Sequence, residues 1–403
     1  MRRWHRYWQK LPRSWRQLLF HAMTSAGVSR ADGDVAGFRE PVVVAGVLRA
    51  ATGLGQAARL AVHALRSADI PCATADLTET LFQRPSEPFD PGPVIAKGPG
   101  TLLIFVTPPN VPLALRAIGA PKLAGKRRIG AWVCEAERLP PLWRRQAAFL
   151  HDVVAPSRFS QAAIAKAIGR PVRLLIHPVE AEPWPLEARP RAPGATLGAV
   201  LDIGSSSARK NVDGLIECCR QLLALRPDAK VAWKVRDSAA DPEVAARLAA
   251  TASSHPDRIA LHSGDWSREG VLAFLDSIDL LLSFSRAEGF GLPIAEAMRR
   301  GVAVAAPIWG GPADYLDASC AIPLPFRLAP IVDPSGLYRP SQGEWADVDP
   351  NEAAGVLSAV LARQAVLDPI VTEARRRSHD LFSVRRFIEQ LRDESAGSRP
   401  DAL

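Results

Sequence analysis

The stretch DLLLSFSRAEGFGLPIAEAMRRG, residues 279–301, joins an apolar run to a helix through a glycine-rich loop. DLLLSF (279–284) is typical of a buried strand, and SRAEGFGL follows it as a loop. Pro293 suits the first position of a helix, because its φ is fixed and it has no N–H to leave unpaired. The helix is predicted to end at Gly301, a residue type common just beyond a helix end. A strand, a loop and a helix in this order are the unit of parallel α/β sheets.

Two glutamates eight positions apart occupy this junction. Glu288 lies in the loop, and Glu296 lies one turn inside the predicted helix. Ligands of open parallel sheets bind beyond the carboxyl ends of strands, where such loops enter helices. Gly289 and Gly291 let the backbone approach a ligand, and the free N–H groups of the helix start attract an anion. Two carboxylates here suit a polyhydroxy ligand, because each accepts two hydrogen bonds from a vicinal diol. The alternative is that both only complement the helix dipole.

The same alternation of apolar runs and helical stretches extends along the chain. Strands are predicted at PVVVAGVL (41–48), TLLIFVT (101–107), IGAWVC (129–134) and HDVVAPS (151–157). After the proline-rich AEPWPLEARPRAPGAT (181–196) the alternation restarts with LGAVLDI. Two tandem α/β domains are therefore predicted. The expected segments are a basic Trp/Arg-rich segment 1–40, an N-terminal Rossmann-like domain 41–185, a linker 186–197, a C-terminal domain 198–370, and a C-terminal helix, 371–403, packing back on the N-terminal domain or on the second.

Length and composition limit the class of protein. A chain of 403 residues suits two domains, and 47% apolar with 23% charged residues is typical of a globular protein. No apolar run is long enough to span a membrane, and no signal peptide is recognised. The five cysteines form no CxxC pattern and are odd in number, which favours reduced thiols over disulfides or a zinc site. We therefore expect a cytoplasmic protein.

The basic charge is concentrated at the N-terminus. Residues 1–31 hold seven Lys and Arg and no acid, while the whole chain carries +8 (50 − 42), so the remaining residues are nearly neutral. A nearly neutral body argues against nucleic acid as a partner. Trp4, Trp8 and Trp15 are interleaved with arginines, a composition typical of an anchor on anionic lipid. We expect residues 1–20 to contact the inner face of the membrane peripherally, or alternatively to pack on the protein.

A second loop, DIGSSSARKN (202–211), leads from the LGAVLDI strand to a helix that Asn211 can cap. Arg209 and Lys210 stand at the start of this helix, where the dipole already favours negative charge. Basic residues at this position make electrostatic sense when an anion is bound. The alternative is a solvated basic loop.

A third loop, TGLGQAA (52–58), follows the first strand. Gly53, Gly55 and Ala58 match GxGxxA, the dinucleotide fingerprint, although four residues separate the strand from the first glycine. A loop that approaches a phosphate or a sugar is an equally plausible interpretation. Two DxD pairs, Asp32–Asp34 and Asp347–Asp349, follow no strand, and we interpret both as chance. No metal site and no cofactor are predicted.

These loops together resemble the retaining glycosyltransferases of family 4, also called glycosyltransferase group 1, which have the GT-B fold. SRAEGFGLPIAEAMRRGVAVAA is similar to the E-x7-E signature of that family, and LDIGSSSARKNVDGLIECC is similar to its basic phosphate loop. VVAPSRFSQAAI, IHPV and GLGQAAR resemble N-domain landmarks in the same order. The resemblance covers about residues 41–320. It implies two Rossmann-like parallel-sheet domains that face each other across a cleft.

The resemblance also implies roles for particular residues. Arg209 and Lys210 would neutralise the leaving nucleoside diphosphate, and Glu288 would contact hydroxyls of the transferred sugar. Glu296 would bind the ribose hydroxyls. The remaining donor contacts would be the backbone at Gly289, Phe290, Gly291 and Leu292, with Gly53 and Gly55 approaching from the opposite domain. IGAWVCEAERLP resembles a segment that makes Glu135 an acceptor candidate. Members with LHRSEGFG carry His where Ser285 stands here, so a role of that His does not transfer.

The implied activity is transfer of a hexose-type sugar, with retention and without a metal, from a UDP- or GDP-sugar to a glycan or lipid-linked acceptor in polysaccharide or glycoconjugate synthesis. Preorganised cations stabilise the charge that builds on a departing phosphate, consistent with Arg209 and Lys210. Two alternatives remain. The protein could be a catalytically silent GT-B binding subunit, or an NAD-dependent oxidoreductase that uses GLGQAA, which leaves the basic and acidic loops unexplained.

Overall fold

The structure is a computed structural model that describes residues 19, 21–31, 35, 37–93, 95–179 and 195–393. The chain divides by packing into two compact units. The first runs to Trp132 and includes Pro141–Val154, and the second comprises Val133–Pro140 and everything from Ala155 onward. The predicted linker, 186–197, lies largely outside the described residues, so the domain boundary proposed from the sequence stays a prediction.

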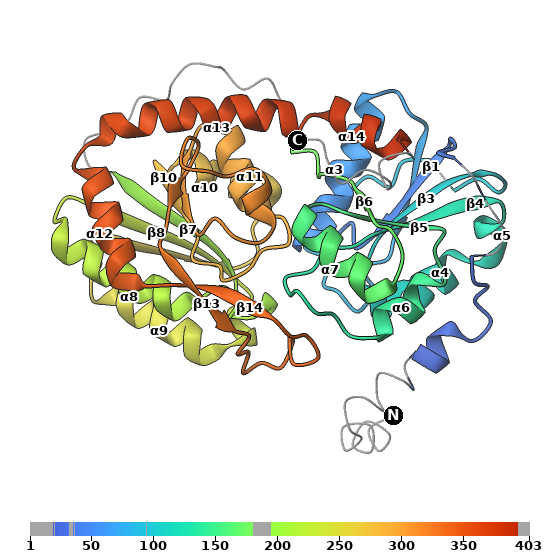
Figure 1. Cartoon of the computed structure of the whole chain (residues 1–403), viewed down its shortest axis with the longest axis horizontal. Helices are drawn as coiled ribbons and strands as arrows, with labels where there is room; N and C mark the ends of the chain where they lie inside the picture. The colour runs from blue at the N-terminus through green and yellow to red at the C-terminus, as the bar shows by residue number, and fades with distance from the viewer. Residues whose placement is uncertain are drawn as a thin grey trace. The chain divides into compact units, whose positions relative to one another are not determined.

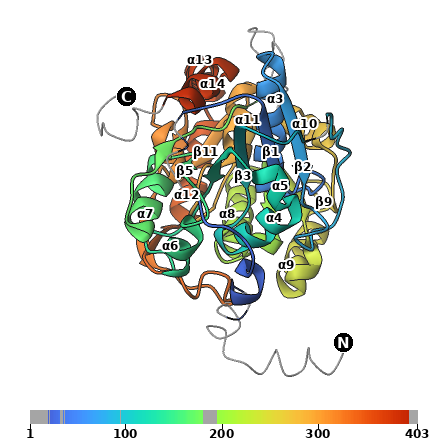
Figure 2. The ribbon, with the colours of Figure 1, turned by 90° about the vertical axis from the view of Figure 1, so that its right-hand side faces the viewer.

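The first sheet is parallel, with its strands in the order β2-β1-β3-β4-β5-β6. Its strands are β1 (Val42–Gly46), β2 (Cys72–Asp76), β3 (Gly100–Phe105), β4 (Lys126–Ala131), β5 (Asp152–Ala155) and β6 (Arg173–Leu174). The helices that follow them are α3 (Gly53–Ser67), α4 (Val111–Ile118), α5 (Ala120–Leu123), α6 (Leu142–Ala147) and α7 (Arg158–Ile168). Figure 2 shows β1, β2 and β3 with α3, α4 and α5 beside them. The strand order reverses between β1 and β3, and α3 begins in the loop after β1.

The second sheet is also parallel and six-stranded, in the order β12-β11-β10-β7-β8-β9. Its strands are β7 (Thr196–Asp202), β8 (Lys230–Arg236), β9 (Ile259–Ser263), β10 (Leu280–Leu282), β11 (Ala303–Ala306) and β12 (Ile322–Pro323). A hairpin of β13 (Phe326–Pro330) and β14 (Glu344–Val348) follows. The order reverses between β7 and β10, which are direct neighbours. Ligands of doubly wound sheets bind at such a reversal point, beyond the carboxyl ends of the two strands.

Helices cover both faces of the second sheet. They are α8 (Val212–Leu225), α9 (Pro242–Ser253), α10 (Arg268–Asp276), α11 (Leu292–Arg299), α12 (Pro350–Leu361) and α13 (Leu367–Leu381). The last helix, α14 (Val384–Arg392), instead contacts β6, where Arg173 Nη1 donates to the Gln390 carbonyl at 3.1 Å. Successive residues of a strand point to opposite faces. Leu280 and Leu282 accordingly pack with α8, α9 and α12, whereas Leu281 packs with α10, α11 and α13. Figure 1 shows the sheet between these two sets of helices. Burial on both faces explains why the strands read as continuous apolar runs.

The helix predicted from Pro293 to the residue before Gly301 is confirmed as α11. Pro293 stands in its first turn, and Gly301 follows it with φ +70°. The predicted cap of the preceding basic loop is also confirmed, because the Asn211 side chain accepts a hydrogen bond of 3.3 Å from the Gly214 N–H at the start of α8. Both loops therefore end where the sequence predicts a helix start.

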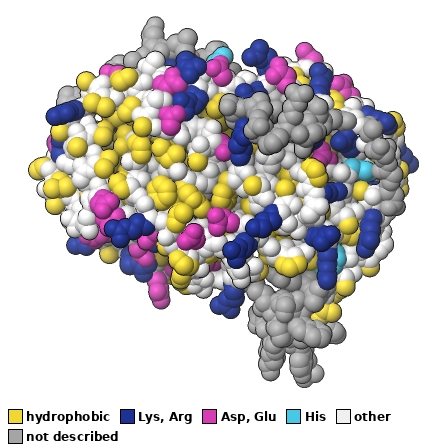
Figure 3. Space-filling view, viewed as in Figure 1, with side chains coloured by type: hydrophobic (Ala, Val, Ile, Leu, Met, Phe, Trp, Pro, Cys, Tyr) yellow, Lys and Arg dark blue, Asp and Glu magenta, His cyan; other side chains and the backbone are white. Residues whose placement is uncertain are grey.

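The surface of the folded chain carries charges of both signs. Figure 3 shows Lys and Arg interspersed with Asp and Glu across one face, as expected from the nearly neutral sequence beyond residue 31. The five cysteines are all free and buried. In the described part of the chain no single helix has the length and apolarity to cross a membrane, although the bent pair Pro350–Leu361 and Gln364–Arg392 passes on length and composition.

Candidate functional site

The two loops singled out from the sequence meet at the reversal point of the second sheet. β7 leads into Arg209 and Lys210 at the start of α8, and its neighbour β10 leads into Glu288. The Lys210 Nζ donates to Glu288 Oε1 at 2.5 Å, and Arg209 Nη1 lies 3.3 Å from Glu288 Oε2. Because adjacent parallel strands end at the same sheet edge, residues 78 positions apart form one charged cluster.

The Arg209 side chain is buried and held by three hydrogen bonds to its neighbours. Only 3% of the residue is exposed. Its Nη1 donates to the Ala287 carbonyl at 2.6 Å, its Nε donates to the Ser205 carbonyl at 3.2 Å, and its Nη2 donates to the Ser205 hydroxyl at 3.0 Å. Burial alone would lower the pKa of Arg209, but the surrounding Tyr338, Glu288 and Glu135 raise the pKa above its usual range. The guanidinium is therefore a permanent positive charge that holds two loops together.

Glu288 is held as a carboxylate by its neighbours. Burial alone would raise the pKa of its carboxyl, but the charges of Lys210 and Arg209 outweigh burial and lower the pKa to about 2, with a further hydrogen bond from Ser285. Its side chain is 14% exposed. The cluster thus holds two cations and one carboxylate, a net positive charge at the start of α8, which suits an anionic ligand bearing hydroxyl groups.

Arg268 was not singled out from the sequence, yet it contacts a predicted site residue. Glu296 is 3% exposed inside α11, and the Arg268 Nη1 at the start of α10 donates to its Oε1 at 2.7 Å. The pair links the carboxyl-end loop of β9 to the helix that follows β10. No sequence signal identified Arg268, because its position opposite Glu296 depends on the packing of two helices.

Packing and backbone conformation explain why glycine stands at two positions of the E-x7-E stretch. A Cβ on Gly289 would lie 2.1 Å from Val133 Cγ2 and 2.8 Å from the Cys134 carbonyl oxygen. Gly291 has φ +86° and is the N-cap of α11. Leu292 begins α11 and packs partly on the core. The expectation that these glycines admit a ligand stays a prediction, since close approach of the protein's own segments already requires small residues there.

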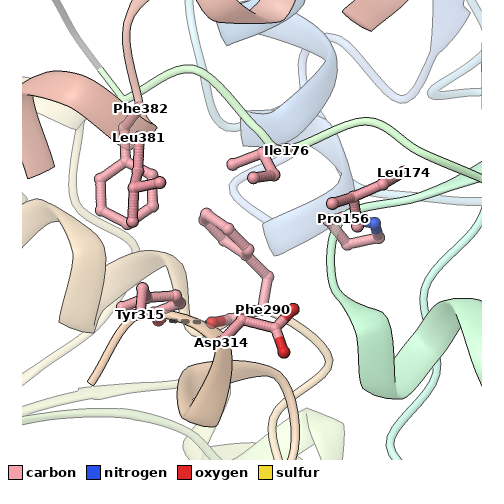
Figure 4. A pocket seen from close by; sticks show the side chains of 8 residues that line it. All are labelled: Pro156, Leu174, Ile176, Phe290, Asp314, Tyr315, Leu381 and Phe382. Atoms are coloured by element: carbon pink, nitrogen blue, oxygen red, sulfur yellow. Dashed lines mark hydrogen bonds between the residues drawn. The ribbon is translucent and has the colours of Figure 1, made fainter. Parts of the chain in front are cut away.

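The Phe290 side chain packs into the core and holds this loop in place. Its ring packs against those of His177, Tyr315 and Phe382 with centroids 5.0–5.6 Å apart, and the Tyr315 hydroxyl donates to its carbonyl at 2.5 Å. Figure 4 shows the ring in a small apolar hollow lined by Pro156, Leu174, Ile176, Asp314, Tyr315, Leu381 and Phe382. The lining of the hollow is apolar except for Asp314, so the hollow offers none of the cations of the charged cluster.

Glu135, the acceptor candidate, belongs to the second unit by packing. The Tyr338 hydroxyl donates to its Oε2 at 3.1 Å, and the Trp345 indole N–H donates to its carbonyl at 2.9 Å. Glu135 also acts electrostatically on Arg209. The structure therefore brings Glu135 into the neighbourhood of the cluster through Tyr338, a residue that the sequence did not indicate.

The glycines of the third loop lie in the first turn of α3. Thr52 caps the helix, and a Cβ on Gly55 would lie 2.4 Å from the Ala50 carbonyl and 2.7 Å from that of Val47. Gly53 has nothing within 4 Å of its would-be Cβ. Gly55 is therefore required by its own turn, whereas Gly53 leaves open space in which a ligand can approach.

The two DxD pairs have separate outcomes. Asp347 forms an ion pair of 2.7 Å with Arg286, and Asp349 caps α12 by accepting from the Asn351 and Glu352 N–H groups. These contacts support the interpretation that this DxD match is chance. Asp32–Asp34 lies outside the described residues. Across the ranges that the structure describes, no group of three His, Cys, Asp or Glu is arranged to hold a metal, and the metal-free expectation stays a prediction.

Comparison with known proteins agrees with the fold. Residues 157–348, just under half of the chain, match the family model described as family 4 glycosyltransferase in conflict systems. This region contains the whole charged cluster and both loops. No curated protein sequence matches the chain significantly.

Three solved structures share the fold. Sucrose-phosphate synthase from Thermosynechococcus elongatus superposes with a TM-score of 0.61 at 14% identity, over 87% of this chain and 97% of that one. Anabaena HepE, solved with UDP-glucose, gives 0.59 at 13% identity, over 87% and 97%. TarM from S. aureus, in a complex containing UDP, gives 0.55 at 13% identity, over 72% of this chain but only 54% of that one.

The fold that follows is GT-B, with two parallel-sheet α/β units, and the second of them contains the region that matches a family 4 glycosyltransferase model. Within that fold, the resemblance to family 4 drawn from the sequence is confirmed by the family match and the fold.

Proposed function

We propose that the protein transfers a hexose-type sugar, with retention, from a nucleotide sugar to a glycan or lipid-linked acceptor. The single observation that carries the proposal is the Lys210–Glu288 pair beside Arg209 at the reversal point of the second sheet. A diphosphate needs cations, a sugar needs hydrogen-bond acceptors for its hydroxyls, and the cluster offers both within one ion pair.

Lys210 is the residue that meets the diphosphate in this proposal. Its ammonium carries three donors, of which one reaches Glu288. Arg209 is largely engaged with Ser205, Ala287 and Glu288, so it supplies fixed charge and positions the carboxylate. As the anomeric C–O bond to the phosphate breaks, its electron pair goes to the phosphate oxygen, and preorganised positive charge stabilises it. The acceptor hydroxyl forms the new bond on the same face and gives its proton to the leaving phosphate.

In this proposal Glu288 accepts hydrogen bonds from hydroxyls of the transferred sugar, and Glu296 accepts them from the ribose hydroxyls. Glu288 is ionised and can accept two hydrogen bonds from neighbouring hydroxyls. Glu296 is held by Arg268, so its carboxylate has a fixed orientation before the ligand arrives. Gly53 is a further proposed donor contact, supported by the open space beside it. No metal is required in this scheme, because Lys210, Arg209 and the start of α8 supply positive charge.

A UDP-sugar is the first donor to test, since HepE was solved with UDP-glucose and the pneumococcal O-GlcNAc transferase GtfA, which has a TM-score of 0.51, with UDP and GlcNAc. The experiment is a thermal-shift and calorimetric screen of UDP, GDP and NAD(H), followed by hydrolysis of the matching nucleotide sugars with and without EDTA. Binding of UDP or GDP, with turnover that resists EDTA, is expected. Binding of NAD(H) alone would replace the proposal with an oxidoreductase, and binding without turnover on any acceptor would favour a silent GT-B subunit.

The proposed location is the cytoplasmic side of a membrane. Its support is the Trp/Arg-rich composition of residues 1–20, which suits anionic lipid and would bring the enzyme to a membrane-borne acceptor. The structure describes only Leu19 of that stretch.

A further inference from the structure

The loop between β13 and β14, residues 331–343, is tied to the phosphate-binding loop. Asp333 Oδ1 accepts a hydrogen bond of 2.9 Å from the Ser206 hydroxyl, and Ser206 in turn accepts at 3.1 Å from the Arg209 backbone N–H. Asp333 Oδ2 accepts at 2.9 Å from the Tyr338 backbone N–H. Asp333 thus fixes both its own loop and the loop that carries Arg209.

Tyr338 stands at the centre of these contacts. The face of its ring lies 6.0 Å from the Arg209 Cζ, and its hydroxyl donates to Glu135 Oε2 at 3.1 Å. Its ring meets that of Trp345 edge-on with centroids 5.2 Å apart, and the Trp345 N–H bonds the Glu135 carbonyl. The Tyr338 side chain therefore contacts the Arg209 guanidinium, the Glu135 carboxylate and Trp345 of the β13–β14 hairpin.

We propose that Tyr338 is a positioning residue for a nucleoside diphosphate site, which it serves through Arg209 and Glu135. The inference rests on the proposed function, because it takes the diphosphate as the ligand of the charged cluster. An aromatic face attracts a cation without neutralising it. Tyr338 can therefore hold Arg209 in place and shield it from water while leaving its charge available to a phosphate, which a carboxylate in the same place would not do.

The hydroxyl of Tyr338 donates to Glu135 and keeps its proton. Burial raises its pKa, Arg209 lowers it and Glu135 raises it, and the net pKa lies well above that of a free tyrosine. The phenol therefore keeps its proton at neutral pH and holds one oxygen of Glu135, which leaves the other oxygen to an incoming hydroxyl.

The test compares three variants of the full chain. Tyr338→Leu keeps apolar volume but removes the aromatic face, and Tyr338→Phe keeps the face but removes the hydroxyl. Leu337→Ala is the matched control, because Leu337 is the adjacent residue and is 50% exposed. Affinity for UDP and GDP is measured by calorimetry, and binding of the corresponding nucleosides, which lack phosphate, by ligand-observed NMR.

Tyr338→Leu is expected to weaken nucleoside diphosphate binding about tenfold, the upper range of a desolvated cation–aromatic contact, while nucleoside binding stays unchanged. Tyr338→Phe should restore affinity to within about twofold of the wild type, and Leu337→Ala should match the wild type. Tyr338→Met serves the same purpose should the leucine variant not fold.

Three outcomes overturn the inference. They are a Leu variant that binds the diphosphate as the wild type does, equal losses for diphosphate and nucleoside, and a Phe variant as weak as the Leu variant. Failure of the wild type to bind either UDP or GDP is a different result, because it overturns the proposed function itself.

Discussion

Lys210 and Glu288, 78 positions apart, form a hydrogen-bonded ion pair of 2.5 Å where two neighbouring strands of the second sheet end. The other oxygen of the Glu288 carboxylate lies 3.3 Å from Arg209 Nη1, so one carboxylate faces two cations. A bound diphosphate would compete with Glu288 for Lys210.

Lys210→Ala is expected to abolish sugar transfer and to weaken UDP or GDP binding by at least about tenfold, because charge-assisted hydrogen bonds to phosphate are lost. The protein should remain folded, since Arg209 still balances Glu288. Calorimetry and a donor-hydrolysis assay measure both effects. Lys230→Ala removes an exposed lysine at the start of β8 and serves as the control. Full activity of the Lys210 variant would refute the site assignment.

Glu288→Gln separates binding from transfer. The amide cannot hold Lys210 as a carboxylate does, so the ammonium becomes more available and nucleoside diphosphate affinity should stay equal or rise. Transfer should fall at least about a hundredfold, because the charged grip on the sugar hydroxyls is lost. Calorimetry with UDP and with UDP-glucose gives the two affinities. A large fall in UDP affinity would show instead that Glu288 mainly orders the phosphate loop.

The same variant tests the pH dependence of stability. The folded pKa of Glu288, about 2, lies below the ordinary value of 4.5. The contribution of this carboxylate is therefore fully present above about pH 4.5 and is lost as the pH falls towards 2. It is worth about 3 kcal/mol at most by linkage. Urea unfolding of wild type and Glu288→Gln from pH 7 to 3 should show a stability difference that is constant above pH 5 and shrinks below it. A difference that changes between pH 5 and 7 would contradict the assignment.

Arg268→Ala should remove the 2.7 Å ion-pair partner of the buried Glu296 carboxylate and destabilise the protein by about 3 kcal/mol. Replacing both partners, in Arg268→Ala with Glu296→Gln, should restore part of that stability. Nucleotide binding by the double variant should be weaker than in the wild type, because the proposed carboxylate contact with the ribose is lost. Thermal unfolding of the two single variants and the double variant measures the coupling. Additive losses would show that the two side chains do not depend on each other. Arg220→Ala, on an exposed i,i+3 pair with Glu217, is the control for loss of a surface ion pair.

Deletion of residues 2–20 tests the membrane contact. Vesicles containing anionic lipid should bind the full chain and lose most of that binding with the deletion, more so at low salt because the attraction is electrostatic. Neutral vesicles provide the control. Unchanged sedimentation with anionic vesicles would remove the proposal, and donor hydrolysis by the shortened protein would show that its catalytic unit is intact.

Local features of this protein were readable from the sequence. Pro293 and Gly301 marked the bounds of α11, Asn211 marked the start of α8, and the apolar runs marked the strands, because these signals depend on φ preferences, side-chain capping and burial within a few residues. The sequence also placed one basic and one acidic loop after strands of the second domain, but only the fold made those strands, β7 and β10, direct neighbours.

Contacts between distant segments were decided only by the tertiary structure. Arg268 opposite Glu296, Tyr338 between Arg209 and Glu135, and the packing reasons for Gly55 and Gly289 left no local signal. The sequence by itself determined the α/β class, the loops and the residues that carry charge there. The structure decided which charges meet and which are held, because those depend on distances between side chains that only the packing of sheet, helices and hairpin sets.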